Sequence, residues 1–166
     1  MAACLELDSS RFCYYCEVGM LIDVVDLELV TKYKINIQLD SEYVYGIEAA
    51  GPIFAKEIGK ANIEKVSVLC LDHTNKIINF AVISIGNDES VRVSMSQLFR
   101  IVLLSNATKI VVGHNHPSGV LEITEPDILM TKKIGQIAFL LGIKLIDSVI
   151  VNANGDSISI RESIGE

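Results

Sequence analysis

Long apolar runs and an N-terminal export signal are both missing from this 166-residue chain. No stretch approaches the roughly 18 consecutive apolar residues of a membrane-spanning helix, because polar residues interrupt the two richest segments, 20–30 and 134–146. The first residues, MAAC, lack the basic region and the apolar region of a secretion signal. These absences predict a cytoplasmic protein with no membrane attachment.

Basic residues are too few for nonspecific binding to duplex DNA. Fourteen lysines and arginines stand against 21 acidic residues, which gives a formal net charge of −7. Nonspecific DNA binding is driven mainly by cationic side chains that release counterions from the phosphates. Any contact with nucleic acid would therefore depend on a local basic patch.

The four cysteines leave two interpretations open. Cys13 and Cys16 offer a redox pair or, together with Cys70 and His73, the ligands of a zinc site. The alternative is that Cys70 is an ordinary small core residue, since it lies within a β-branched run. We favour the core interpretation for Cys70.

Length and patterning predict one mixed α/β (α+β) domain. Residues 1–20 show little pattern and form a leader of undefined structure, while residues 21–166 have the length of a single domain. Strands alternate with helices, which favours a mostly antiparallel mixed sheet with about three helices. The expected strands are one or two within 21–39, a hairpin of 66–71 and 77–85, then 109–114, 143–151 and 157–160. The expected helices run from Gly51-Pro52 to about 60, from 95 to 106 after a Ser94–Gln97 cap, and from Thr124 to Gly142.

A pair of histidines at the end of a strand predicts a metal site. His114 and His116 are two residues apart, so their imidazoles lie on the same side of the sheet. Asp127, in the first turn of the next helix, adds a carboxylate if residues 117–123 fold that helix start back against the strand. Two imidazoles and one carboxylate bind Zn2+ with one position open for water, as catalytic zinc sites require. A plain helix cap explains Thr124 and Asp127 equally well, but it leaves the two histidines unexplained.

The run GHNHPSG at 113–119, followed by Thr124 and Asp127, resembles the JAMM metal-binding motif of JAB/MPN domains. Further segments are similar to the RadC branch of that family, so the resemblance covers roughly residues 22–162. These segments are 64–76, 104–107, 140–147 and 159–162.

The resemblance implies a cytidine-deaminase-like sandwich and a zinc metallopeptidase-type hydrolase that cleaves peptide or isopeptide bonds. It assigns the metal to His114, His116 and Asp127. It assigns the general base to Glu64, for which a solvated strand-end carboxylate is the alternative, and an oxyanion-stabilising hydroxyl to Thr124. A peptide or protein substrate follows, a homodimer is compatible, and nucleic acid enters only through the association of the family with DNA repair.

Two departures from the RadC pattern concern residues outside the ligand set. Ser94, Met95, Ser96 and Gln97 stand where these proteins usually have His-Pro-Arg-Glu, and Ser148 stands where they have a histidine. Both changes bear on substrate contacts and on the level of activity. Two other functions therefore stay open, a noncatalytic MPN-type binding module and a DNA-repair-associated RadC-type protein.

Two other enzyme classes do not fit. In nucleases with a His-Asn-His motif the three residues are spread over a ββα element, whereas here they are contiguous. A zinc deaminase would need His-x-Glu followed by Pro-Cys-x-x-Cys, and neither occurs.

Overall fold

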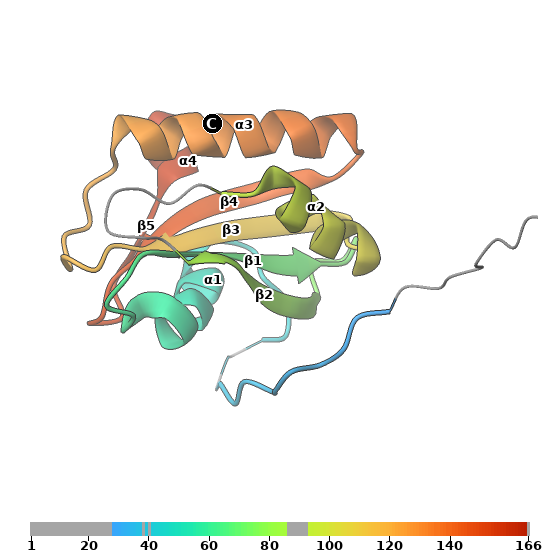
Figure 1. The fold of residues 1–166 in the computed structure, drawn as a ribbon, viewed down its shortest axis with the longest axis horizontal. Coiled ribbons are helices and arrows are strands. Elements are labelled where there is room, and N and C mark those ends of the chain that lie inside the picture. The colour runs from blue at the N-terminus through green and yellow to red at the C-terminus, as the bar shows by residue number, and fades with distance from the viewer. Residues whose placement is uncertain (1–27, 38, 40, 86–92, 166) are drawn as a thin grey trace, which may run out of the picture.

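A computed structural model describes residues 28–37, 39, 41–85 and 93–165, in which five strands form one mixed sheet of order β2-β1-β3-β4-β5 (Figure 1). The strands are β1 (Lys65–Leu71), β2 (Ile77–Ile85), β3 (Lys109–Asn115), β4 (Lys144–Val151) and β5 (Ser157–Ser159). The helices are α1 (Ile47–Phe54), its π-helical continuation η1 (Ala55–Gly59), α2 (Met95–Leu104), α3 (Glu125–Leu140) and α4 (Ile160–Ile164). No helix among these residues is long and apolar enough to cross a membrane.

Helices cover both faces of the sheet. Figure 1 shows α2 and α3 on one face and α1 on the other. On the sheet, Val66 and Val112 pack with α2 and α3, whereas Leu69 and Val111 pack with α1. Strands buried on both faces are apolar at nearly every position, which explains the continuous runs in β1 and β3. The predicted mixed α/β sandwich is confirmed.

The sheet is mostly antiparallel, as expected, with one parallel pair. β1 pairs antiparallel with β2 and β3, β4 pairs antiparallel with β5, and β3 pairs parallel with β4. A parallel pair needs a crossover connection, because the chain must return to the end of the sheet from which the first strand started. Here α3 is that crossover. Its first turn therefore lies beside the carboxyl end of β3, where the paired histidines are.

The opening strand predicted within 21–39 is wrong for residues 28–37 and 39, which form no strand. Residues 21–27 lie outside the described part of the chain. Ile37 and Leu39 do pack against the core beneath α1, so the alternating pattern reflects burial. Burial alone does not give the segment a neighbouring strand with which to form backbone hydrogen bonds. The next described residue along the chain that pairs is Tyr43, which forms an isolated β-bridge with Lys76.

The predicted helix at Gly51-Pro52 begins earlier, at Ile47, and contains Pro52. Gly51 allows close packing instead of starting the helix, because a Cβ atom there would lie 2.3 Å from the Ser157 hydroxyl oxygen. The prediction also omitted α4, whose cap, Ser159, accepts a hydrogen bond from the backbone of Glu162. The described residues therefore hold four α-helices, one more than expected.

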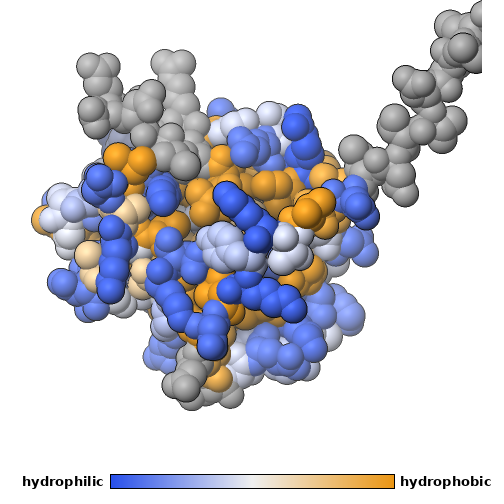
Figure 2. Space-filling model, turned by 60° about the horizontal axis from the view of Figure 1, so that its bottom comes forward, coloured by the Kyte–Doolittle hydropathy of each residue, from blue (hydrophilic) through white to orange (hydrophobic). Residues whose placement is uncertain are grey.

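An apolar pocket of about 660 Å3 lies between residues 29–35, 37 and 39 and the edge strand β2. Figure 2 turns the underside of the molecule forward and shows apolar surface gathered between hydrophilic side chains. None of the predicted metal ligands lines this pocket. The predicted metal ligands lie elsewhere, on the face of the sheet covered by α3.

Candidate metal centre

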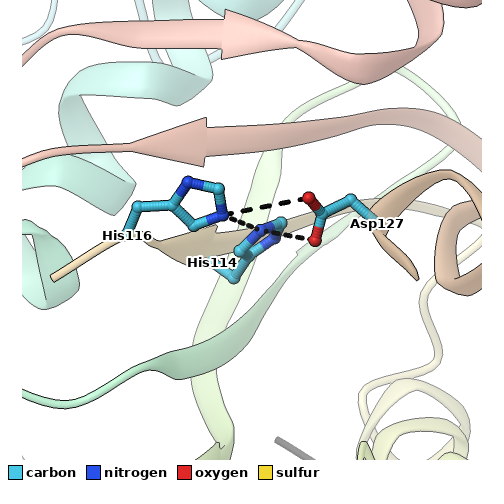
Figure 3. Close-up of side chains that lie close together, drawn as sticks. All are labelled: His114, His116 and Asp127. Carbon is cyan, nitrogen blue, oxygen red and sulfur yellow. Dashed lines mark hydrogen bonds and ion pairs between the residues drawn. The ribbon is translucent and has the colours of Figure 1, made fainter. Parts of the chain in front are cut away.

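The structure brings His114, His116 and Asp127 together (Figure 3). His114 lies in β3, His116 follows the strand, and Asp127 is the third residue of α3. The two histidine Nε2 atoms are 3.2 Å apart. His114 Nε2 is 3.1 Å from one carboxylate oxygen of Asp127, and His116 Nε2 is 3.9 Å from the other. Three potential ligand atoms therefore face a common point.

The spacing of the two imidazole nitrogens fits a tetrahedral metal ion. Zinc–nitrogen bonds of about 2.0–2.1 Å place two tetrahedral ligand atoms about 3.3–3.4 Å apart. The two imidazole nitrogens are 3.2 Å apart, close to that value, and one ligand atom from each of the three residues lies within 4.8 Å of the others. Two nitrogens and one carboxylate oxygen are also a common donor set for catalytic zinc. The geometry therefore supports a metal site here.

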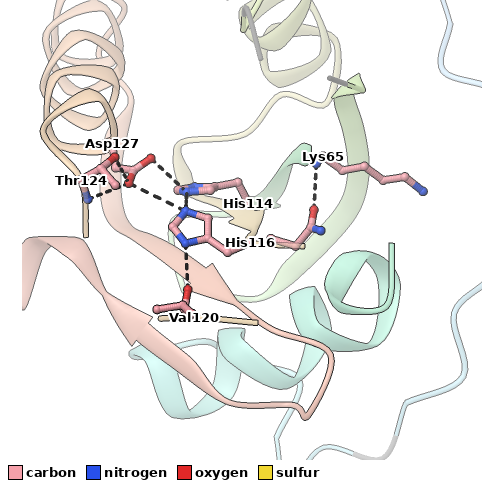
Figure 4. A network of polar contacts seen from close by, with 7 residues as sticks. Lys65, His114, His116, Val120, Thr124 and Asp127 are labelled. Atoms are coloured by element: carbon pink, nitrogen blue, oxygen red, sulfur yellow. Dashed lines mark hydrogen bonds and ion pairs between the residues drawn. The ribbon is translucent and has the colours of Figure 1, made fainter. Parts of the chain in front are cut away.

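Contacts on the outer side hold His116 and Asp127 in place (Figure 4). His116 Nδ1 lies 3.0 Å from the backbone oxygen of Val120, which fixes the ring with Nε2 toward the other ligands. The Thr124 N–H and hydroxyl both donate to Asp127 Oδ2, at 2.9 and 2.5 Å. The other carboxylate oxygen is then left facing His114. A helix cap formed by Thr124 and Asp127 is therefore compatible with a metal site, because the cap also orients the Asp127 carboxylate.

Asp127 is ionised at neutral pH. Its burial raises the pKa, but hydrogen bonds from His114 and Thr124 outweigh this effect and lower the pKa to about 2. Only a deprotonated carboxylate binds a metal ion well. Asp127 is therefore already in its metal-binding form at physiological pH.

The turn after β3 brings α3 back to the strand. Gly119 adopts the left-handed conformation, with a φ of 79°, and its N–H donates to the backbone oxygen of His116. The side chain of Asn152, just after β4, donates to the Gly119 oxygen at 3.2 Å. Residues 117–123 thus fold the start of α3 back against the strand, as the metal interpretation requires, and Asn152 anchors the turn in a way that sequence spacing did not reveal.

Glu64 directly precedes β1 and is half-buried. Val66 pairs with His114 in the antiparallel register, so continuing that register brings Glu64 opposite His116. The group of converging ligand atoms does not include Glu64. The general-base role that the family resemblance assigns to Glu64 therefore stays a prediction.

Of the two departures from the family pattern noted in the sequence, the one that begins at Ser94 has an ordinary structural role. Ser94 caps α2 by accepting a hydrogen bond from the backbone of Gln97, as predicted. Ser148 is fully buried in β4, and its hydroxyl has no hydrogen-bond partner among the described residues. His114 Nδ1 is also buried without such a partner.

The alternative zinc site receives no support from the described residues. Cys70 is fully buried in the core on the α2 side, while His73 is exposed in the hairpin turn. Cys13 and Cys16 lie outside the described part of the chain. The core interpretation of Cys70 is therefore confirmed.

Comparison with known proteins identifies a shared family. The model of the RadC-like JAB domain matches residues 44–165. A UPF0758 protein of Finegoldia magna is 32% identical over 138 residues, 83% of this chain and 61% of that protein. A UPF0758 protein of Trichormus variabilis is 36% identical over 124 residues, 75% of this chain and 51% of that protein. The chain thus spans about half to three fifths of the length of these relatives.

Proposed function

The chain belongs to the RadC-like JAB domain family, and we propose that it is a zinc-dependent hydrolase of amide bonds in peptides or proteins. The observation that supports the proposal is the convergence of His114, His116 and Asp127, whose potential ligand atoms lie within 4.8 Å of one another. When bound there, Zn2+ would supply the Lewis acidity that activates water and polarises a carbonyl group. His114, His116 and Asp127 would hold it.

In this proposal Glu64 is the general base. Its carboxylate would accept a proton from the attacking water and return it to the departing amine. Its place beside His116 in the strand register supports the role. Peptide cleavage at neutral pH needs both proton transfers, because an amine anion is too poor a leaving group to depart unprotonated.

Thr124 has two candidate roles. The family resemblance assigns its hydroxyl to the oxyanion of the tetrahedral intermediate. In the structure that hydroxyl donates its single proton to Asp127. We propose that Thr124 primarily orients Asp127, and that any oxyanion contact requires the hydroxyl to rotate when substrate binds.

The test combines metal analysis with a peptide-library hydrolysis screen of the purified protein. Glu64→Gln should retain one equivalent of zinc and lose at least about 100-fold in turnover, the lower range for loss of a general base. Glu48→Gln is a matched control, because Glu48 is exposed in α1 on the opposite face of the sheet. Unchanged turnover of Glu64→Gln would remove Glu64 from the mechanism.

A noncatalytic binding module is the second candidate. The departures from the RadC pattern at Ser94, Met95, Ser96, Gln97 and Ser148 favour it, because they bear on substrate contacts and on the level of activity and leave the candidate metal ligands intact. A protein that binds zinc but cleaves no peptide in the library would support this function over hydrolysis. The DNA-repair association can be tested separately, since binding through phosphate contacts would appear as a salt-sensitive gel shift.

A further inference from the structure

The side chain of Asn115, between the two histidine ligands, makes three hydrogen bonds on the opposite face of the sheet. Its Oδ1 accepts from the Lys65 N–H at 2.8 Å, and its Nδ2 donates to the backbone oxygens of Ala61 and Ile63, both at 3.2 Å. The residue is fully buried. Figure 4 draws the contact of the Lys65 N–H in the same view as the ligand cluster.

These bonds enclose Glu64 on both sides along the chain. The carbonyl of Ile63 and the N–H of Lys65 bind the same side-chain amide, and Glu64 is the residue between them. The backbone ladder between β1 and β3 ends at the pair of Val66 and His114. Beyond that pair, the Asn115 amide holds the incoming chain to the end of β3.

We propose that Asn115 is a positioning residue that fixes Glu64 relative to the metal ligands. The inference rests on the proposed hydrolase function and deepens it. The backbone of Asn115 joins His114 to His116, and its side chain binds the residues on either side of Glu64. Asn115 therefore links the proposed base directly to two candidate ligands. A catalytic base must be held within hydrogen-bond reach of the reacting proton, so movement of this segment would lower the rate.

The contacts require an amide. Asparagine offers one acceptor to the Lys65 N–H and donors to two carbonyl oxygens at once. Aspartate has the same shape but only acceptors, so it would repel the carbonyls of Ala61 and Ile63. Alanine would leave all three buried backbone groups without this partner.

The test is a double-mutant cycle in the full chain. Asn115→Ala should lower kcat by about 10–100-fold, the range typical of lost outer contacts at metal sites. KM and zinc content should stay unchanged. In the Glu64→Gln background the same substitution should cause less than about a twofold further loss, because two residues that act through one function are not additive. Equal losses in both backgrounds would overturn the proposal.

Asn115→Asp provides a second variant should alanine fail to fold, and the same pattern is expected from it. Asn79→Ala is the matched control. Asn79 is a half-buried amide of β2 that donates to Ser105, remote from the ligand cluster. It should leave kcat unchanged; a loss equal to that of Asn115→Ala would attribute the effect to general destabilisation and overturn the proposal.

Amide hydrogen exchange supplies a readout independent of activity. The Lys65 N–H should exchange faster in Asn115→Ala than in the wild type, whereas the core amide of Val68 should not. Equal exchange at Lys65 would overturn the inference about Asn115 alone. Faster exchange at Lys65 in Asn115→Ala, found together with a zinc-loaded wild type that cleaves no peptide, would instead reject the hydrolase function, and with it a catalytic role for Asn115.

Discussion

The two ends of the β1–β3 pair both carry polar clusters with a histidine and an aspartate, yet they differ in where the polar atoms point. At the hairpin end, Asp72 accepts from the N–H and the hydroxyl of Thr74 and from the Lys76 N–H. Lys109 donates to the backbone oxygen of His73 and to Asn75. Each donor there meets an acceptor. At the ligand end, two imidazole nitrogens lie 3.2 Å from each other.

A lowered aspartate pKa does not distinguish the two ends. Hydrogen bonds from Thr74 lower the pKa of Asp72, and the contacts with His114 and Thr124 lower that of Asp127 despite its burial. The difference is convergence: among the described residues, His114, His116 and Asp127 are the group that places three potential ligand atoms within 4.8 Å of one another. The candidate metal site is therefore distinguished by the grouping of its potential ligand atoms, not by the lowered pKa of its aspartate.

The largest expected effect is loss of metal on substitution of a ligand. His114→Ala should abolish stoichiometric zinc, with affinity lowered by more than the about 10–100-fold that loss of an outer contact causes. His73→Ala, at the hairpin end, should keep the metal content of the wild type. Elemental analysis of both purified variants measures the contrast. Retention of one zinc by His114→Ala would show that the His114 end of the sheet binds metal no more specifically than the hairpin end.

The next effect concerns the packing that holds the ligand end in place. A Cβ atom at Gly113 would lie 2.4 Å from Cδ1 of the buried Phe54 ring. Gly113→Ala should therefore destabilise the protein by about 1–3 kcal/mol through overpacking. Gly135→Ala in α3 is the control, since its Cβ would meet Leu145 at 3.6 Å and helix propensity favours alanine. Thermal unfolding should show opposite shifts for the two variants; equal shifts would show that Phe54 moves aside.

A smaller effect is expected at the helix cap. Thr124→Ala removes the hydroxyl that binds Asp127, so it should lower stability by about 1 kcal/mol. It should also weaken zinc binding by about 10-fold, the lower range for an outer contact. Thr124→Ser keeps the hydroxyl and should restore both properties. Zinc competition titrations check this, and equal weakening by alanine and serine would show that the methyl group, not the hydroxyl, matters.

Local spacing accounts for what could be predicted of the site. His114 and His116 share a face because they are two apart, and Asp127 is three residues after the helix cap, so short-range geometry located all three. The role of Asn115 could not be found in this way, because its partners lie 50–54 positions away in the chain. The only local signal, its position between two ligands, says that it faces away from the metal.

The sequence predicts a strand correctly where its pattern of apolar residues indicates both an extended conformation and the neighbouring strand with which it pairs. The hairpin of β1 and β2 has two β-branched runs and a short turn, so each strand supplies the partner of the other. The alternating segment at 33–39 indicates extended backbone and one buried face, but it names no partner. α4 is five residues long, too short for a helical period to be recognised.

The smallest expected effect tests the hairpin end through Cys70. Burial raises the pKa of its thiol to about 11, although a hydrogen bond with Ser105 lowers it. An unfolded thiol ionises near 9.0, so Cys70 stabilises the fold up to that pH, and this contribution is lost as pH rises through 11. At pH 8 the folded protein should therefore leave Cys70 unalkylated, and denaturant should expose it, as peptide mass spectrometry can measure. A zinc-bound Cys70 would be a thiolate instead, so rapid alkylation in the folded protein that zinc prevents would return this end of the sheet to the list of metal sites.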